Sequence, residues 1–167
     1  MTHRGHPREI TGVKPFMTEA DMRGWMRLTF GSRVFWLEPS AGSTFGFPDA
    51  MIVLPSEAKR ASYTVLVEAK LATEAKGVLR FRVRTPQVIC LSRLVDLGVP
   101  VIGLVGVRGT GDLYWVPVGE EFLAGALGTG GKNGSRGLLF KVARGTSCDY
   151  QMARLSEALT SRVRIRS

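Results

Sequence analysis

The stretch from Val99 to Val107 limits the possible folds most, because none of its side chains is charged or forms hydrogen bonds. A short apolar run of this kind is typical of a β-strand that is buried on both faces, as in a parallel or mixed sheet. Such a strand needs other elements on each side of its sheet. The sequence therefore predicts an α/β fold with a mixed central β-sheet that is flanked by helices.

Other segments predict elements that suit this layered arrangement. We expect helices where a capping pattern precedes apolar residues at helical spacing, and strands where apolar and β-branched residues lie between turn-forming residues. The expected helices run from Thr18 to Thr29, from the N-cap Thr85 to a stop at Gly98, from Glu120 to Leu127 and from Asp149 to Leu159. The expected strands, besides Val99 to Val107, are Arg33 to Leu37, Ala50 to Leu54, Tyr63 to Leu71, Asp112 to Val118 and Leu138 to Ala143.

The length of 167 residues predicts one domain with its own hydrophobic core, to which we assign residues 1–127. From Gly128 to Gly137 the chain is so rich in glycine that regular structure is not expected. Residues 128–167 are therefore predicted to be a glycine-rich loop followed by a basic C-terminal extension of the same domain.

The net charge of +9, from 23 Lys and Arg against 14 Asp and Glu, points to a polyanionic partner, with nucleic acid as the leading class. No apolar stretch approaches the roughly 18 residues that a membrane-spanning helix needs, and no secretory signal is visible, so we expect a cytoplasmic protein that works without a membrane. The two cysteines lack CxxC spacing, and both histidines, His3 and His6, lie near the first residue. This pattern argues against a disulfide scaffold, a zinc cage and a histidine-dependent triad.

Two short segments combine groups that suit phosphate chemistry: Phe47-Pro48-Asp49 and Glu68-Ala69-Lys70, each attached to a predicted strand. Glu68 and Lys70 project from the same face of an extended chain, and Asp49 reaches them if the two strands pair. Carboxylates of this kind bind Mg²⁺, or Mn²⁺ in its place, and a nearby lysine can orient the attacking water. Singly, each segment is more often a turn or a solvated ion pair. Their combination favours a metal site, because the charges interrupt an otherwise apolar strand.

With these residues the chain resembles the PD-(D/E)XK nuclease superfamily, and within it the small Holliday-junction-resolvase-like and VRR-NUC-like proteins. The resemblance covers about Thr18 to Val107. It rests on Gly46-Phe47-Pro48-Asp49-Ala50, on Val67-Glu68-Ala69-Lys70 and on the helix that begins Thr85-Pro86-Gln87. It implies a restriction-endonuclease-like core.

The resemblance also implies roles for single residues. Asp49, Glu68 and the carbonyl of Ala69 would bind the metal, and Lys70 would position the hydrolytic water. Gln87 matches a glutamine that lies near the active site in these families, and an ordinary polar residue in a first helical turn is an equally good interpretation.

These families often carry a further acidic residue in their first helix. Glu19 is the candidate here and Asp21 is its rival, although both also suit the positive end of a helix dipole. Glu38, shortly before the Pro-Asp segment, is another acidic candidate without an assigned role.

Basic residues follow the metal-site strand without an intervening acid: Lys76, Arg80, Arg82, Arg84 and Arg93. The alternating spacing of the three central arginines presents them together on an extended chain. A row of this kind suits contacts with nucleic-acid phosphates better than a solubilising surface, which usually mixes both signs of charge. We therefore assign these five residues to nucleic-acid binding.

The sequence thus predicts a Mg²⁺-dependent endonuclease that hydrolyses DNA phosphodiester bonds, with junction or branched DNA as the first substrate to consider. The resemblance to resolvases implies a homodimer, because two strands must be cut. Two alternatives stay open. One is another nuclease of the same superfamily, either homing, restriction-like or RNA-cutting, and the other is a basic nucleic-acid-binding or assembly protein that keeps the fold without catalysis.

Overall fold

The computed structural model describes residues 15–37, 46–55, 62–130, 139–142 and 148–165. Its helices are α1 (Glu19–Phe30), α2 (Thr85–Asp96), α3 (Glu120–Ala124) and α4 (Cys148–Ile165), with a short 3₁₀ turn, η1 (Gly31–Arg33), after α1. Its strands are β1 (Val34–Trp36), β2 (Ala50–Pro55), β3 (Ser62–Ala75), β4 (Val78–Arg80), β5 (Val101–Val107), β6 (Leu113–Pro117), β7 (Ala126–Gly128) and β8 (Phe140–Lys141).

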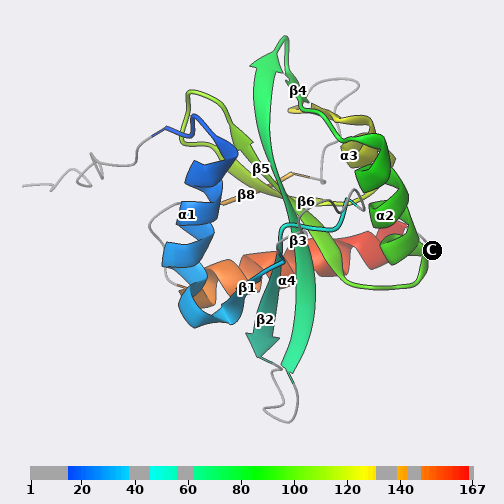
Figure 1. The fold of residues 1–167 in the computed structure, drawn as a ribbon. Helices are drawn as coiled ribbons and strands as arrows, with labels where there is room; N and C mark the ends of the chain where they lie inside the picture. Colours follow the sequence, from blue (N-terminus) through cyan, green and yellow to red (C-terminus); the bar gives the residue numbers. More distant parts are fainter. Residues whose placement is uncertain (1–14, 38–45, 56–61, 131–138, 143–147, 166–167) are drawn as a thin grey trace, which may run out of the picture.

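The strands form one mixed sheet with the order β1-β2-β3-β5-β6-β8, and β4 pairs with both β3 and β7. Strands β3 and β5 run parallel in the register Leu66 with Val101 through Ala72 with Val107, whereas the other pairings between the described strands are antiparallel. A parallel pair needs a long crossover, and here the crossover contains α2. The expected α/β fold with a mixed, helix-flanked sheet is confirmed (Figure 1).

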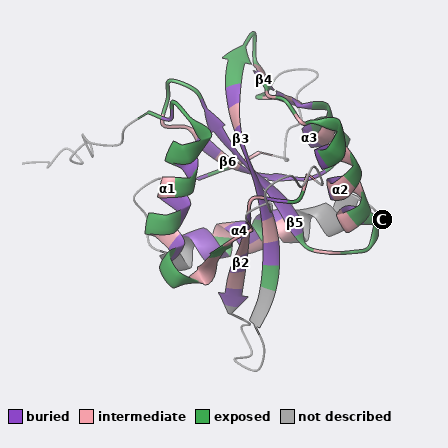
Figure 2. Cartoon of the chain, in the orientation of Figure 1, coloured by how far each residue is buried: buried purple, intermediate pink, exposed green. Residues whose placement is uncertain are grey.

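Two hydrophobic clusters cover the two faces of this sheet. Helices α1 and α4 pack on one face, where Met22, Trp25 and Leu155 meet the apolar residues of β3 and β5. Helices α2 and α3 pack on the other face, where Leu91 and Phe122 contribute to the second cluster. Every residue of β5 is buried between them, as its apolar sequence predicted (Figure 2). None of the described helices has the length and apolar character that crossing a membrane requires.

The structure corrects the expected bounds at the hairpin of β3 and β4. Strand β3 extends to Ala75 instead of ending at Leu71, and it turns through Lys76 and Gly77, both with positive φ (52° and 74°), into β4. The usual sequence signal for such a two-residue turn is Asn-Gly, and a lysine seldom takes a positive φ. The sequence Lys-Gly therefore did not indicate this hairpin. The short strand β4 was missed because pairing with two partners, and not its own composition, holds it in the sheet.

Three predicted helix ends are also wrong, and the first is that α4 runs to Ile165 instead of ending at Leu159. The helix expected to reach Leu127 ends at Ala124, because Gly125 takes a left-handed conformation and the chain leaves to pair as β7 with β4. The N-cap of α2 is Arg84 instead of Thr85, so Pro86 lies one position further into the first turn. The strand expected from Arg33 begins only at Val34, after the 3₁₀ turn.

Candidate active site

The pairing of β2 with β3 brings the two sequence segments together. The register runs from Pro55 with Ser62 to Ala50 with Val67, so Asp49 follows directly as the residue opposite Glu68. Asp49 is held there by two bonds: its carbonyl accepts from the backbone N–H of Leu37 at 3.0 Å, and its Oδ2 accepts from the N–H of Ala69 at 2.8 Å. The strand pairing on which the predicted site depends is confirmed.

Glu68 and Lys70 point toward the face of the sheet that α2 covers, while Val67 and Ala69 pack into the cluster on the opposite face. Both charged side chains are buried, with 1% and 6% of their surface exposed. Lys70 Nζ lies 2.9 Å from Glu68 Oε1. A pair of charges taken out of water in this way is costly unless further hydrogen bonds satisfy it.

Gln87 supplies those further bonds. Its Nε2 donates to Glu68 Oε1 at 2.6 Å, and its Oε1 accepts from Lys70 Nζ at 3.0 Å and from the backbone N–H of Arg84 at 3.1 Å. Gln87 is 6% exposed and stands in the first turn of α2. The structure therefore brings Gln87 together with Glu68 and Lys70.

The start of α2 is also seated against the segment that leads to Asp49. Gly46 has φ +62°, and a Cβ at this position would overlap the backbone of Pro86 and Gln87. A glycine permits both the positive φ and the close approach. The loop that carries Asp49 and the helix that carries Gln87 are thus packed directly against each other.

One oxygen of this cluster is left without a hydrogen-bond partner in the described part of the chain. Glu68 Oε2 is buried and accepts no bond. Burial and, after it, the nearby Asp49 carboxylate raise the pKa of Glu68 from 4.5 to about 7, although Lys70 acts in the opposite direction. A cation beside the two carboxylates would lower the pKa of Glu68 again, because it would offset both the burial and the charge of Asp49.

The donor set fits Mg²⁺. The described residues contain no group of three or more His, Cys, Asp and Glu that could hold a metal, but Mg²⁺ commonly uses one or two carboxylates together with waters and substrate oxygens. Asp49 and the open oxygen of Glu68 are such carboxylates. The side chain of Asp49 is 18% exposed, so this carboxylate of the pair reaches solvent.

Arg23 in α1 is a site residue that the sequence did not predict. Its Nη2 donates to Asp49 Oδ1 at 2.8 Å. Helical spacing places Met22 and Met26 in the core and leaves Arg23 at the edge of that face. No signal in the sequence connects this arginine to an aspartate in a distant strand, so only the tertiary structure could reveal the pair.

The further acidic candidates lie in different settings. Asp21 Oδ2 accepts from the backbone N–H groups of Met17 and Thr18 at 2.8 Å each, which completes the N-terminal cap of α1. Glu19 is exposed in the first turn, and among the charges that act on the pKa of Glu68 its effect is the smallest. Glu38 lies outside the described residues.

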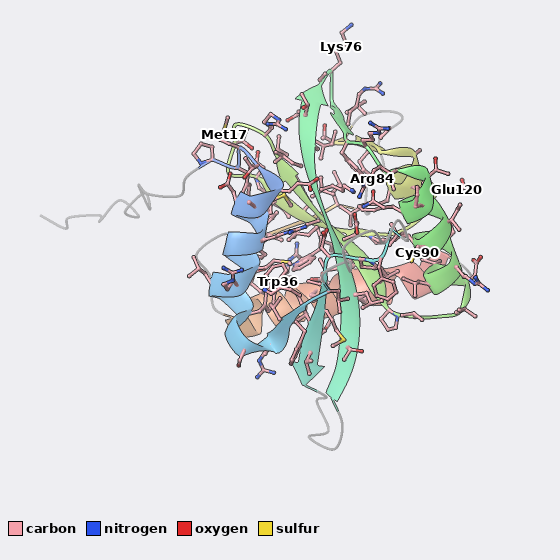
Figure 3. The ribbon with its side chains drawn as sticks, viewed as in Figure 1. Met17, Trp36, Lys76, Arg84, Cys90 and Glu120 are labelled. Carbon is pink, nitrogen blue, oxygen red and sulfur yellow. The ribbon has the colours of Figure 1, made fainter. Side chains whose placement is uncertain are left out.

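The basic row runs from the tip of the β3–β4 hairpin to the start of α2, as the labels of Lys76 and Arg84 show (Figure 3). The connecting chain alternates as expected: the arginines are exposed, while Phe81 and Val83 between them pack against the second cluster. The exposed members of this row are Lys76, Arg80, Arg82 and Arg84, whereas Arg93 is exposed in the last turn of α2 and lies apart from it.

Comparison with known proteins adds no further assignment, since the chain matches no protein-family model, no curated protein and no solved structure. The class of site is therefore defined by its own geometry. The site consists of two neighbouring carboxylates, a buried lysine and a buried glutamine, next to an exposed basic row. One of the carboxylates has a buried oxygen without a partner among the residues that the structure describes.

We expect Gly46→Ala to destabilise the protein by about 1–3 kcal/mol more than Gly98→Ala. Both glycines have positive φ, +62° and +75°, but a Cβ at Gly98 meets nothing within 4 Å. The two variants thus share the backbone strain and differ in the overlap with α2. Urea denaturation of both variants measures the difference, and equal losses would contradict the packing described here.

In metal-free buffer with EDTA, wild type should lose stability relative to Glu68→Gln as the pH rises from about 4.5 to about 7. The folded state holds the Glu68 proton up to a pKa of about 7, whereas the unfolded chain releases it near 4.5. The stability linked to this proton is complete below pH 4.5 and is lost by about pH 7, amounting to about 2–3 kcal/mol. Denaturation at a series of pH values checks this, and a difference that does not vary with pH would disprove it.

Proposed function

We propose that this chain is a Mg²⁺-dependent endonuclease of the PD-(D/E)XK type that hydrolyses DNA phosphodiester bonds. The observation that carries the proposal is the buried Oε2 of Glu68, which has no hydrogen-bond partner among the described residues and lies beside Asp49 and Lys70. A chain that only bound nucleic acid would gain nothing from burying these charges, because their desolvation costs free energy. A metal site would explain why Glu68 and Lys70 are buried, because both side chains would then take part in the reaction.

Each residue of the site has a distinct part in the proposed reaction. Asp49 and Glu68 hold the ion, with the Ala69 carbonyl as the third protein ligand that the resemblance implies. Two of the three N–H donors of Lys70 meet Glu68 and Gln87, which leaves one in the described structure to orient a water for attack. Gln87 keeps the lysine and the carboxylate in place. When bound, Mg²⁺ supplies charge stabilisation at the phosphate and lowers the pKa of water.

The basic row supports DNA as the substrate. Exposed arginines that alternate along one segment bind backbone phosphates, which contributes affinity without reading the sequence. We propose junction or branched DNA as the first substrate and a homodimer as the active form, since a branched molecule must be cut in two strands. We propose that the protein acts inside the cell, in the cytoplasm.

Asp49→Asn and Lys70→Met should each reduce Mg²⁺-dependent cleavage by a factor of about 10² to 10⁴, because one removes a metal ligand and the other the group that orients water. Asp112→Asn is the control: it removes the same charge, but from a carboxylate that pairs with Lys141 at 3.3 Å. Cleavage is measured on a four-way junction, plain duplex, single-stranded DNA and RNA of matched sequence.

The pattern of products decides between the alternatives. Equal cutting of junction and duplex would reject branched DNA as the preferred substrate, and cutting of RNA alone would make the chain a ribonuclease. Nucleic-acid binding without Mg²⁺- or Mn²⁺-dependent cleavage of any substrate would reject catalysis and favour a binding or assembly protein.

Replacing Arg80, Arg82 and Arg84 together with Gln should weaken DNA binding for every sequence and reduce the slope of log K against log salt by about 3, close to one per lost phosphate contact. Arg154→Gln is the control, because this arginine pairs with Glu157 at 2.7 Å in α4. Filter binding or fluorescence anisotropy in EDTA measures affinity without cleavage. An unchanged slope in the triple variant would show that the row does not contact DNA.

A further inference from the structure

The two carboxylates of the site differ in how their oxygens are engaged. Asp49 uses both: Oδ1 accepts from Arg23 at 2.8 Å and Oδ2 accepts from the N–H of Ala69 at 2.8 Å. Within the part of the chain that the structure describes, Glu68 is engaged through Oε1, and its Oε2 accepts no hydrogen bond. An ion that binds the open oxygen of Glu68 therefore needs a second carboxylate oxygen that already has a partner.

A metal ion could displace one of the two hydrogen-bond donors to the Asp49 carboxylate more easily than the other. The N–H of Ala69 belongs to the buried backbone of β3 and cannot move without the strand. The side chain of Arg23 is 49% exposed, and its flexible stem lets the guanidinium swing into water. The helix itself stays in place, because Met22 and Met26 on either side of Arg23 are fully buried.

A cation is present beside Asp49 even without a metal, namely the guanidinium of Arg23. A divalent ion at Oδ1 and the guanidinium repel each other and compete for the same lone pairs. An ion pair as exposed as this one contributes little to stability, so an incoming ion can displace it at a modest cost.

We propose that Arg23 is a displaceable counter-ion of Asp49, which occupies Oδ1 in the metal-free chain, leaves it when a divalent cation binds, and thereby weakens metal affinity. This inference rests on the metal site of the proposed function. Arg23 would then lower the metal affinity of the site and so raise the free metal concentration at which the site fills.

The test is Mn²⁺ binding to the full chain without DNA, measured as the loss of the free-ion signal in electron paramagnetic resonance. Arg23→Gln should bind Mn²⁺ roughly three to ten times more tightly than wild type. Arg27→Gln is the matched control, because it removes the same charge from the same helix one turn later, where the guanidinium stacks 5.6 Å from the ring centre of Trp36. Glu68→Gln and Asp49→Asn should abolish the binding.

Three outcomes would overturn the inference, and they are distinguishable. If wild type binds Mn²⁺ through Glu68 and Arg23→Gln binds it equally or more weakly, Arg23 is not a competitor although the metal site stands. If Arg23→Gln and Arg27→Gln tighten binding to the same extent, the effect is one of general charge. If neither wild type nor Arg23→Gln binds Mn²⁺, the metal site fails and the inference fails with it.

Discussion

The buried ion pair between Lys70 and Glu68 is the constraint on which the rest of the site depends. Two charges inside an apolar sheet are tolerated only when other polar groups satisfy them, and Gln87 meets both. Helix α2 must therefore begin close enough to β3 for Gln87, in its first turn, to reach Glu68 and Lys70. The close approach of Gly46 to the same turn follows from this position, and with it the place of Asp49.

The chain is basic, with a net charge of +9, but the site contains two carboxylates, and the arrangement of the positive charges accounts for both features. The row of exposed arginines leads along the β4 segment to the start of α2, so positive charge ends next to the helix turn that holds Glu68. Carboxylates and phosphates repel each other unless a cation lies between them. In the protein alone, Arg23 and Lys70 supply that positive charge, one on each carboxylate.

Much of the central fold could be predicted because it follows from local patterns. The uncharged run of β5 predicted burial on both faces, and the alternation in β3 predicted that Glu68 and Lys70 share one face, opposite the face on which Val67 and Ala69 pack. Strands β4 and β7 could not be predicted in the same way. Each is three residues long and is held by pairing with a segment distant in the chain, which leaves little trace in composition.

The sequence by itself determined the two carboxylates and the lysine at the centre of the site, because strand periodicity is a pattern of residues that are close together along the chain. Asp49, Glu68 and Lys70 could be brought into one neighbourhood in that way. Only the tertiary structure decided how they are engaged: Gln87 bonds to the buried pair, Arg23 pairs with Asp49, and one oxygen of Glu68 has no partner in the described part of the chain. These contacts depend on how helices pack on the sheet, and side-chain geometry across elements is not encoded in any local pattern.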